Sequence, residues 1–169
     1  MSDLPPAREV LRAPLPRPAH ARVALAHHER PLRRRRLVTA HDEGFLVDLP
    51  RTTVVGHGDA FLLADGRLIE VAAAEEPLIE ARAASSGDLA RLAWHVGNRH
   101  APCQVEADRL LVPRDHVMRA MLVGLGAEAR DVSEPFHPEG GAYAEGLPMG
   151  HSHGPSQGND LGLGALADG

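Results

Sequence analysis

Histidine is the residue type in this sequence best able to do chemistry. Eleven of the 169 residues are His, whereas Cys103 is the single cysteine. One thiol excludes an intrachain disulfide and also the Cys₄ and Cys₂His₂ types of zinc site. Any metal bound by this chain would therefore be held by imidazole, with carboxylate as a second ligand type. These ligands suit nickel, zinc, copper or iron and do not select one of them.

Four histidines are candidate metal ligands. His100 ends a Gly-Asn-Arg-His run, His116 ends an Arg-Asp-His run, and His151 and His153 are separated by one serine. Spacing alone leaves ordinary interpretations open: a loop histidine, a solvated first-turn histidine and a solubilising tail. A tail pair would also bind weakly, because ordering a flexible chain costs about 1–2 kcal/mol per residue.

The first half of the chain predicts a small β-rich domain over residues 21–75, after a flexible, Pro- and Arg-rich lead-in over residues 1–20. Short apolar runs alternate with turn residues, and Asp65-Gly66 between two such runs predicts a hairpin. The expected strands are Val23–Ala26, Arg36–Thr39, Phe45–Leu49, Ala60–Leu63 and Arg67–Ala72.

The second half predicts a β-α-β-β-α-β order over residues 76–145, which is the ferredoxin-like arrangement. Ser85 to Asp88 offer cap residues for a first helix that Gly97 should end. We expect Trp94 and His95 of that helix to pack. The remaining expected elements are strands at Leu78–Ala83, Gln104–Glu106, Leu110–Val112 and Glu128–Ser133, and a second helix from Val117 to Leu125.

This arrangement places two of the candidate ligands apart. Both helices should run in the same direction, so His100 after the first helix and His116 at the start of the second should lie at opposite ends. We therefore expect that they do not share one metal within a chain. Residues 146–169, rich in Gly and small residues, predict a disordered tail.

Composition argues against several classes of function. A net charge of −5 disfavours a nucleic-acid binder, and the run Arg33–Arg36 is better interpreted as a local docking patch for a protein partner. No stretch approaches the roughly 20 apolar residues of a membrane helix, and none near the start suits a signal peptide. We expect a cytoplasmic protein without membrane contact. Nothing orders a His and an Asp around Cys103, so we predict a buried structural thiol and no enzyme activity.

Four separated stretches carry a family resemblance. They are Leu89–Val105, which includes Gly-Asn-Arg-His; Arg114–Val117; Leu125–Ala127; and Glu134–Tyr143. In this order, followed by a short His-containing tail, they resemble the UreE family of urease accessory metallochaperones. The resemblance covers about residues 22–153, and four motifs in the expected order are far more specific than any one of them.

The resemblance implies a homodimer that carries nickel to urease. It implies a partner-binding β-domain, a ferredoxin-like metal-binding and dimerisation domain, and the urease apoprotein and its accessory GTPase complex as partners. His100 matches the family's principal nickel ligand, His116 a weaker position, and His151 and His153 its tail histidines. Arg114 stands where some members have another histidine, and only two histidines occupy the tail. We therefore expect about one ion per dimer, with zinc or copper as substitutes in vitro.

Two further hypotheses remain beside nickel delivery. A protein-interaction adaptor with incidental histidines would bind no nickel and would tolerate His100→Ala. A metallohydrolase would need three convergent ligands with an acid or base, and no such set is visible. Histidine ligation also predicts that metal loading falls below about pH 6.5, because imidazole must be neutral to bind a metal.

Overall fold

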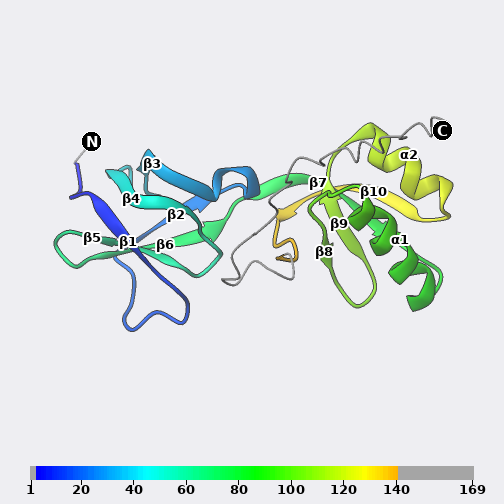
Figure 1. Cartoon of the computed structure of the whole chain (residues 1–169), viewed down its shortest axis with the longest axis horizontal. Coiled ribbons are helices and arrows are strands. Elements are labelled where there is room, and N and C mark those ends of the chain that lie inside the picture. Colours follow the sequence, from blue (N-terminus) through cyan, green and yellow to red (C-terminus); the bar gives the residue numbers. More distant parts are fainter. Residues whose placement is uncertain (1–2, 141–169) are drawn as a thin grey trace, which may run out of the picture. The chain divides into compact units, whose positions relative to one another are not determined.

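The structure, a computed structural model, describes residues 3–140. Residues 3–74 form one six-stranded sheet with the strand order β2-β6-β5-β1-β4-β3, and a single 3₁₀ turn, η1 (His27–Glu29). Figure 1 shows these strands in blue to green. Their bounds are β1 (Ala7–Leu11), β2 (Ala21–Leu25), β3 (Pro31–Val38), β4 (Gly44–Val54), β5 (Ala60–Leu63) and β6 (Leu68–Ala73).

Strand β1 corrects the expectation of a flexible lead-in over residues 1–20. It lies inside the sheet, parallel to β4 and antiparallel to β5, and Ala7 is fully buried. Its partner strands are about 40 to 55 residues away along the chain. No local sequence pattern therefore predicts the pairing. Prolines flank this short strand on both sides, and because prolines are typical of irregular segments, the sequence favours a loop here.

The predicted hairpin at Asp65-Gly66 is confirmed. β5 and β6 pair antiparallel, and Gly66 has a φ of 89°, which glycine adopts without a Cβ clash. The neighbouring turn before β5 is held by Asp59, whose carboxylate accepts from Gly56 N–H at 2.8 Å and from Arg12 at 2.6 Å. These turns close a mostly aliphatic core in which Phe45 and Phe61 are also buried.

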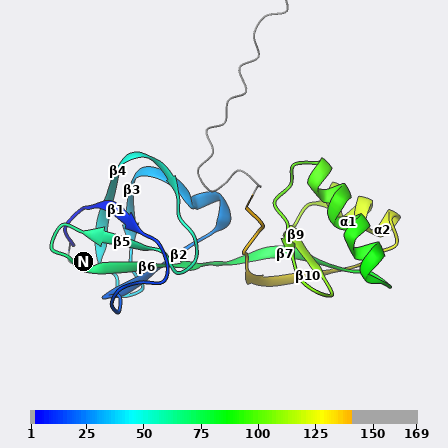
Figure 2. The ribbon, with the colours of Figure 1, turned by 60° about the horizontal axis from the view of Figure 1, so that its bottom comes forward.

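The second half has the element order β-α-β-β-α-β and a four-stranded antiparallel sheet with the strand order β10-β7-β9-β8. The expected elements are all present, with ends shifted by a few residues (Figures 1 and 2). Their bounds are β7 (Glu75–Arg82), α1 (Ser86–Asn98), β8 (Gln104–Val105), β9 (Leu110–Pro113), α2 (His116–Gly124) and β10 (Glu128–Pro135).

Both helices cover the same face of this sheet. Leu92 and Val96 of α1 and Leu122 of α2 belong to one buried cluster with Ile79 and Ala81, alternate residues of β7. Helix α1 begins as predicted, because the Ser85 hydroxyl accepts from Asp88 N–H at 3.1 Å. No helix among residues 3–140 is long and apolar enough to span a membrane.

The opposite face of the sheet carries a charged network centred on Arg109. Its guanidinium contacts Glu80 at 2.9 Å, Glu106 at 2.6 Å and Glu134 at 2.9 Å. Glu80 also accepts from Arg82 at 3.0 Å and is buried. Hydrogen bonds from Arg82 and Arg109 lower the pKa of Glu80, which is therefore held as the carboxylate.

Candidate metal centre

The turn after α1 presents His100 to solvent. The helix ends at Asn98, Arg99 is its C-cap, and His100 N–H donates to Gly97 O at 2.9 Å. His100 has a φ of 54°, the left-handed conformation that commonly closes a helix. Its side chain is exposed. The fold therefore fixes the backbone of His100 while leaving its imidazole accessible.

The prediction that Gly97 ends the first helix is wrong. Gly97 lies within the last turn of α1, and the left-handed residue is His100 itself. Glycine usually occupies that position, and a residue with a Cβ pays about 1–2 kcal/mol there. Histidine is among the residue types that enter this region more often than most. A strained backbone at a candidate ligand is typical of functional sites.

Helix α1, which precedes His100, carries an exposed aromatic side chain. Arg99 Nε lies 2.9 Å from Met121 Sδ, which connects the turn to α2. Trp94 is 64% exposed, and its ring meets that of His95 edge to face, with ring centroids 4.9 Å apart. The expectation that Trp94 packs is therefore wrong within a single chain. The sequence could not reveal this, because a Trp beside an apolar helical stripe is usually covered.

His116 is the first residue of α2 and lies in solvent. Its side chain is 94% exposed, and its Nδ1 is 4.0 Å from Asp115. Asp115 caps the helix by accepting from Met118 N–H at 2.7 Å. Arg114 is occupied elsewhere, since it donates to Val132 O at 3.0 Å. The residues around His116 thus serve the helix and supply no second imidazole.

The described residues contain no preformed metal site. No group of three or more His, Cys, Asp or Glu side chains in residues 3–140 is arranged to hold a metal ion. His100 and His116 therefore do not form a complete site together within this part of the chain. His151 and His153 lie outside the described residues. A site built on His100 needs ligands from beyond this region.

A pair of histidines that the sequence did not indicate offers no second centre. The rings of His57 and His137 are 5.1 Å apart and nearly perpendicular. His57 Nδ1 accepts from Ala73 N–H at 3.2 Å, which places the ring proton on Nε2 and disfavours metal binding there. Burial, then His57 and Arg30, lower the pKa of His137. The pair is best explained as packing of the two rings.

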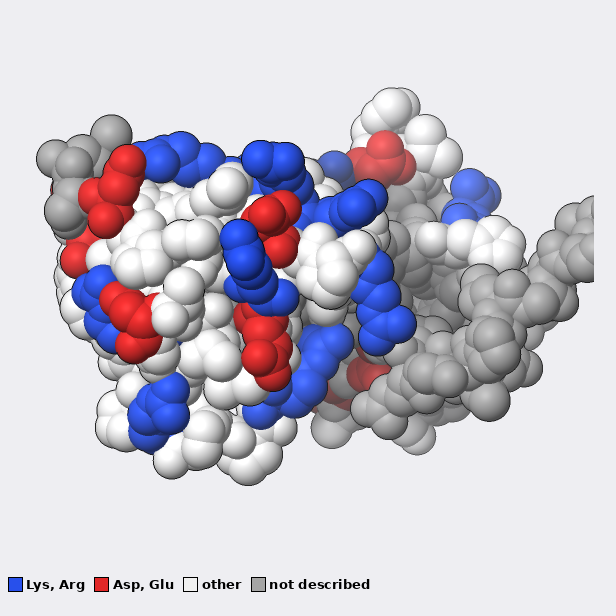
Figure 3. All heavy atoms as spheres, turned by 60° about the vertical axis from the view of Figure 1, so that its left-hand side comes forward, with Lys and Arg blue, Asp and Glu red and all other residues white. Residues whose placement is uncertain are grey.

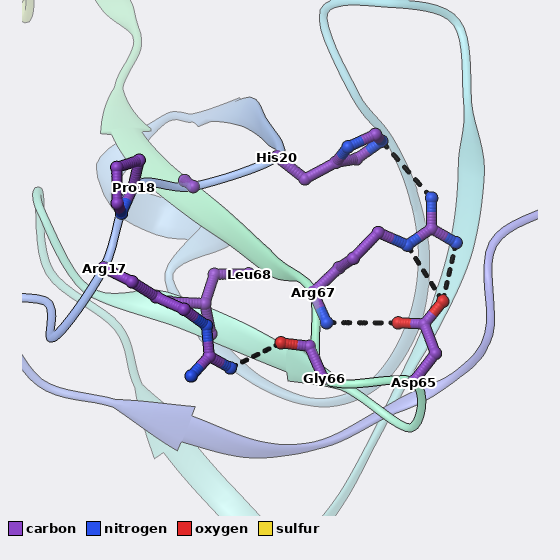
Figure 4. Close-up of a pocket in the computed structure, with 8 residues that line it drawn as sticks. Arg17, Pro18, His20, Asp65, Gly66, Arg67 and Leu68 are labelled. Carbon is purple, nitrogen blue, oxygen red and sulfur yellow. Dashed lines mark hydrogen bonds and ion pairs between the residues drawn. The ribbon is translucent and has the colours of Figure 1, made fainter.

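The polar side chains that line the pocket in Figure 4 pair mainly with one another. Arg67 is neutralised by Asp65, with Nε and Oδ2 2.8 Å apart, and Arg17 donates to Gly66 O at 2.5 Å. His20 lies between Arg67 at 3.4 Å and Glu43 at 3.0 Å. These contacts leave no polar group that requires a ligand.

Cys103 has the properties of a structural thiol. It is half-buried, and its Sγ lies 3.8 Å from the backbone oxygen of Gln104. Burial, assisted by the negative charge of Glu139, raises the pKa of Cys103 to about 11. A thiol with so high a pKa is largely protonated at neutral pH and is a poor nucleophile or metal ligand.

Two family models match consecutive parts of the chain. The model of the N-terminal domain of UreE urease accessory protein matches residues 6–74, and that of its C-terminal domain matches residues 76–160. Three relatives are named "Urease accessory protein UreE". The Ruegeria pomeroyi protein is 54% identical over 89% of this chain and 99% of its own length. The Cereibacter sphaeroides protein is 54% identical (94% and 85% covered), and the Rhodobacter capsulatus protein is 56% identical (79% and 83% covered).

Proposed function

Because the chain belongs to the UreE family of urease accessory proteins, we propose that it binds nickel and delivers it to apo-urease during assembly of the urease active site. Membership of this family supports a role in urease maturation, and we infer no catalytic role. The observation that carries the nickel role is His100, an exposed imidazole on a fixed left-handed turn within the family's C-terminal domain.

The fold of the second half supports a metal-binding and dimerisation domain over residues 76–145. A β-α-β-β-α-β order with strands arranged β10-β7-β9-β8 and two helices on one face is the pattern of a ferredoxin-like domain. Its loops and helix ends, where His100 and His116 lie, remain free for ligands. The first half, residues 21–75 with the addition of β1, would hold protein partners.

A homodimer would complete the site. Trp94 on α1 and Val117 and Val123 on α2 are large apolar side chains exposed in the single chain. We propose that the dimer interface covers them, since partners cover contiguous exposed apolar surface. A twofold axis near the end of α1 would bring His100 against His100 of the partner subunit, because an isologous interface repeats each residue. Two imidazoles then come from one motif.

The remaining histidines would act as supplementary ligands. His151 and His153 would reach the pair of His100 residues from the tail, and His116 would offer a weaker, separate position. Imidazole ligands also accept zinc and copper, so these metals should bind in vitro. A site that is open and shared between subunits can release its ion to the urease apoprotein and its accessory GTPase complex in the cytoplasm. Tighter closure would slow that transfer.

Equilibrium dialysis of the full chain with nickel tests this function directly. Wild type should bind about one ion per dimer, and His100→Ala should lose most of that binding. His20→Ala, which removes an imidazole from the β-domain, is the matched control and should bind like wild type. Activation of apo-urease at limiting nickel should follow the same order. An adaptor would bind no nickel and would support activation equally well without His100.

A further inference from the structure

A run of consecutive arginines on β3 is exposed along its length. Residues 33–36 are all Arg and all exposed, although a strand normally alternates its side chains between two faces. β3 is the last strand in its sheet and pairs with β4 alone in the described part of the chain. The arginines therefore lie at an open side of the sheet.

An irregularity in the ladder puts a fifth arginine in the segment of β4 opposite Arg33. Leu32 pairs with Thr53 but Arg34 pairs with Asp48, so residues 49–52 of β4 oppose Arg33 alone. Arg51 belongs to this extra length of β4 and is exposed. We call Arg33–Arg36 together with Arg51 the arginine strip.

The carboxylates around the arginine strip neutralise only part of it. Arg35 pairs with Glu29 at 2.6 Å, and Arg36 pairs with Asp3. Arg34 is 3.9 Å from Asp48, at the limit of an ion pair. Arg33 and Arg51 make no hydrogen bond or ion pair with another side chain among residues 3–140. Two guanidinium groups thus remain available to an anion.

Exposed apolar side chains lie at both ends of the same ladder. Val54, opposite Pro31, is 60% exposed, and Val38, opposite Gly44, is 45% exposed. Arg12 also reaches one end, where its guanidinium donates to Val54 O at 2.9 Å and pairs with Asp59 at 2.6 Å. Figure 3 shows arginines of the N-terminal half in view, with carboxylates and uncharged side chains between them. This mixture of cations and apolar groups suits a peptide better than a phosphate backbone.

We propose that the arginine strip docks an acidic, extended segment of another protein. Arg33 and Arg35 lie on one face of β3 and Arg34 and Arg36 on the other, so on each face two arginines stand two residues apart. Two residues of an extended chain span about 6.6 Å, and carboxylates at alternate positions of an extended segment have the same spacing. The net charge of −5 leaves this strip as a local positive region that steers acidic partners. The proposal does not depend on nickel.

Fluorescence anisotropy with the full chain and a labelled 12-residue peptide of alternating Glu and Ala tests the proposal. Wild type should bind the peptide, and 0.5 M NaCl should weaken the binding, because exposed charges are screened. The double charge reversal Arg33→Glu/Arg51→Glu should weaken it on the order of tenfold or more. The matched control Arg91→Glu/Arg130→Glu reverses two exposed arginines of the second half and should change it less than about twofold.

Each contrary result overturns the proposal. The proposal fails if wild type does not bind the peptide, or if the control variant weakens binding as much as the reversal variant. It also fails if wild type binds a 12-nucleotide oligo-dT more tightly than the peptide. Self-association of the reversal variant without any loss of peptide binding would show that the strip only guards a strand edge. Should the reversal variant not fold, Arg33→Gln/Arg51→Gln replaces it, with an expected loss of about threefold.

Discussion

Replacing His100 by glycine and by alanine separates the backbone role of this position from its proposed role as a ligand. With a φ of 54°, His100 holds a conformation that costs a residue with a Cβ about 1–2 kcal/mol. Glycine removes that cost but adds about 0.4–1 kcal/mol of unfolded-state entropy. His100→Gly should therefore raise the free energy of unfolding by about 1 kcal/mol, whereas His100→Ala, which keeps the strain, should leave it nearly unchanged.

Thermal and urea unfolding of the metal-free proteins measures the difference. We expect His100→Gly to melt roughly 2–6 °C above His100→Ala, and both variants to lose nickel equally. The matched control is Asn98→Gly, which puts glycine into the last turn of α1 and should lower stability by about 0.5–1 kcal/mol. A His100→Gly variant that is less stable than His100→Ala would refute the left-handed backbone. One that still binds nickel like wild type would refute the ligand role.

Three further predictions follow from other parts of the fold. Because Arg82 and Arg109 lower the pKa of Glu80, its carboxylate stabilises the fold above about pH 4.3 and loses this effect as the pH falls through the lower folded-state pKa. The free energy of unfolding, measured with urea at pH 7 and pH 3.5, should therefore fall less on acidification in Glu80→Gln than in wild type. Glu128→Gln is the control and should behave like wild type, because Glu128 lies 3.9 Å from its partner Arg130. Asp115→Ala should cost about 1 kcal/mol by removing the cap of α2, measured by thermal unfolding, without changing nickel binding. Since the pKa of Cys103 is raised to about 11, iodoacetamide at pH 8 should modify it far more slowly in the native protein than in urea, and equal rates would contradict its burial.

Local signals in the sequence predicted much of the second half and one hairpin of the first. The Ser85 cap, the apolar spacing of α1 and the Asp65-Gly66 turn each depend on a few neighbouring residues, and the structure confirms all three. Strand β1 was missed because its partners β4 and β5 lie far along the chain. Pairing of that kind is decided by the packed sheet and leaves little trace in a five-residue segment.

The candidate site was only partly visible in the sequence. The Gly-Asn-Arg-His motif made His100 a candidate ligand, but the end of the helix was expected at Gly97, since glycine is the usual residue there, and the left-handed residue is His100. The exposure of Trp94 depends on which other elements pack over α1, and the residues around Trp94 in the sequence do not specify this packing. Likewise, the place of Arg51 in the segment of β4 opposite Arg33 follows from a register shift that no sequence pattern specifies.

The metal content of mixed dimers tests the central claim most directly. Wild-type and His100→Ala chains, distinguished by mass, can be combined and examined with nickel by native mass spectrometry. If two His100 side chains build the site, the mixed dimer should lose nickel nearly as completely as the His100→Ala homodimer, while the wild-type dimer holds one ion. A mixed dimer that keeps its nickel as firmly as wild type would contradict a site shared across the twofold axis.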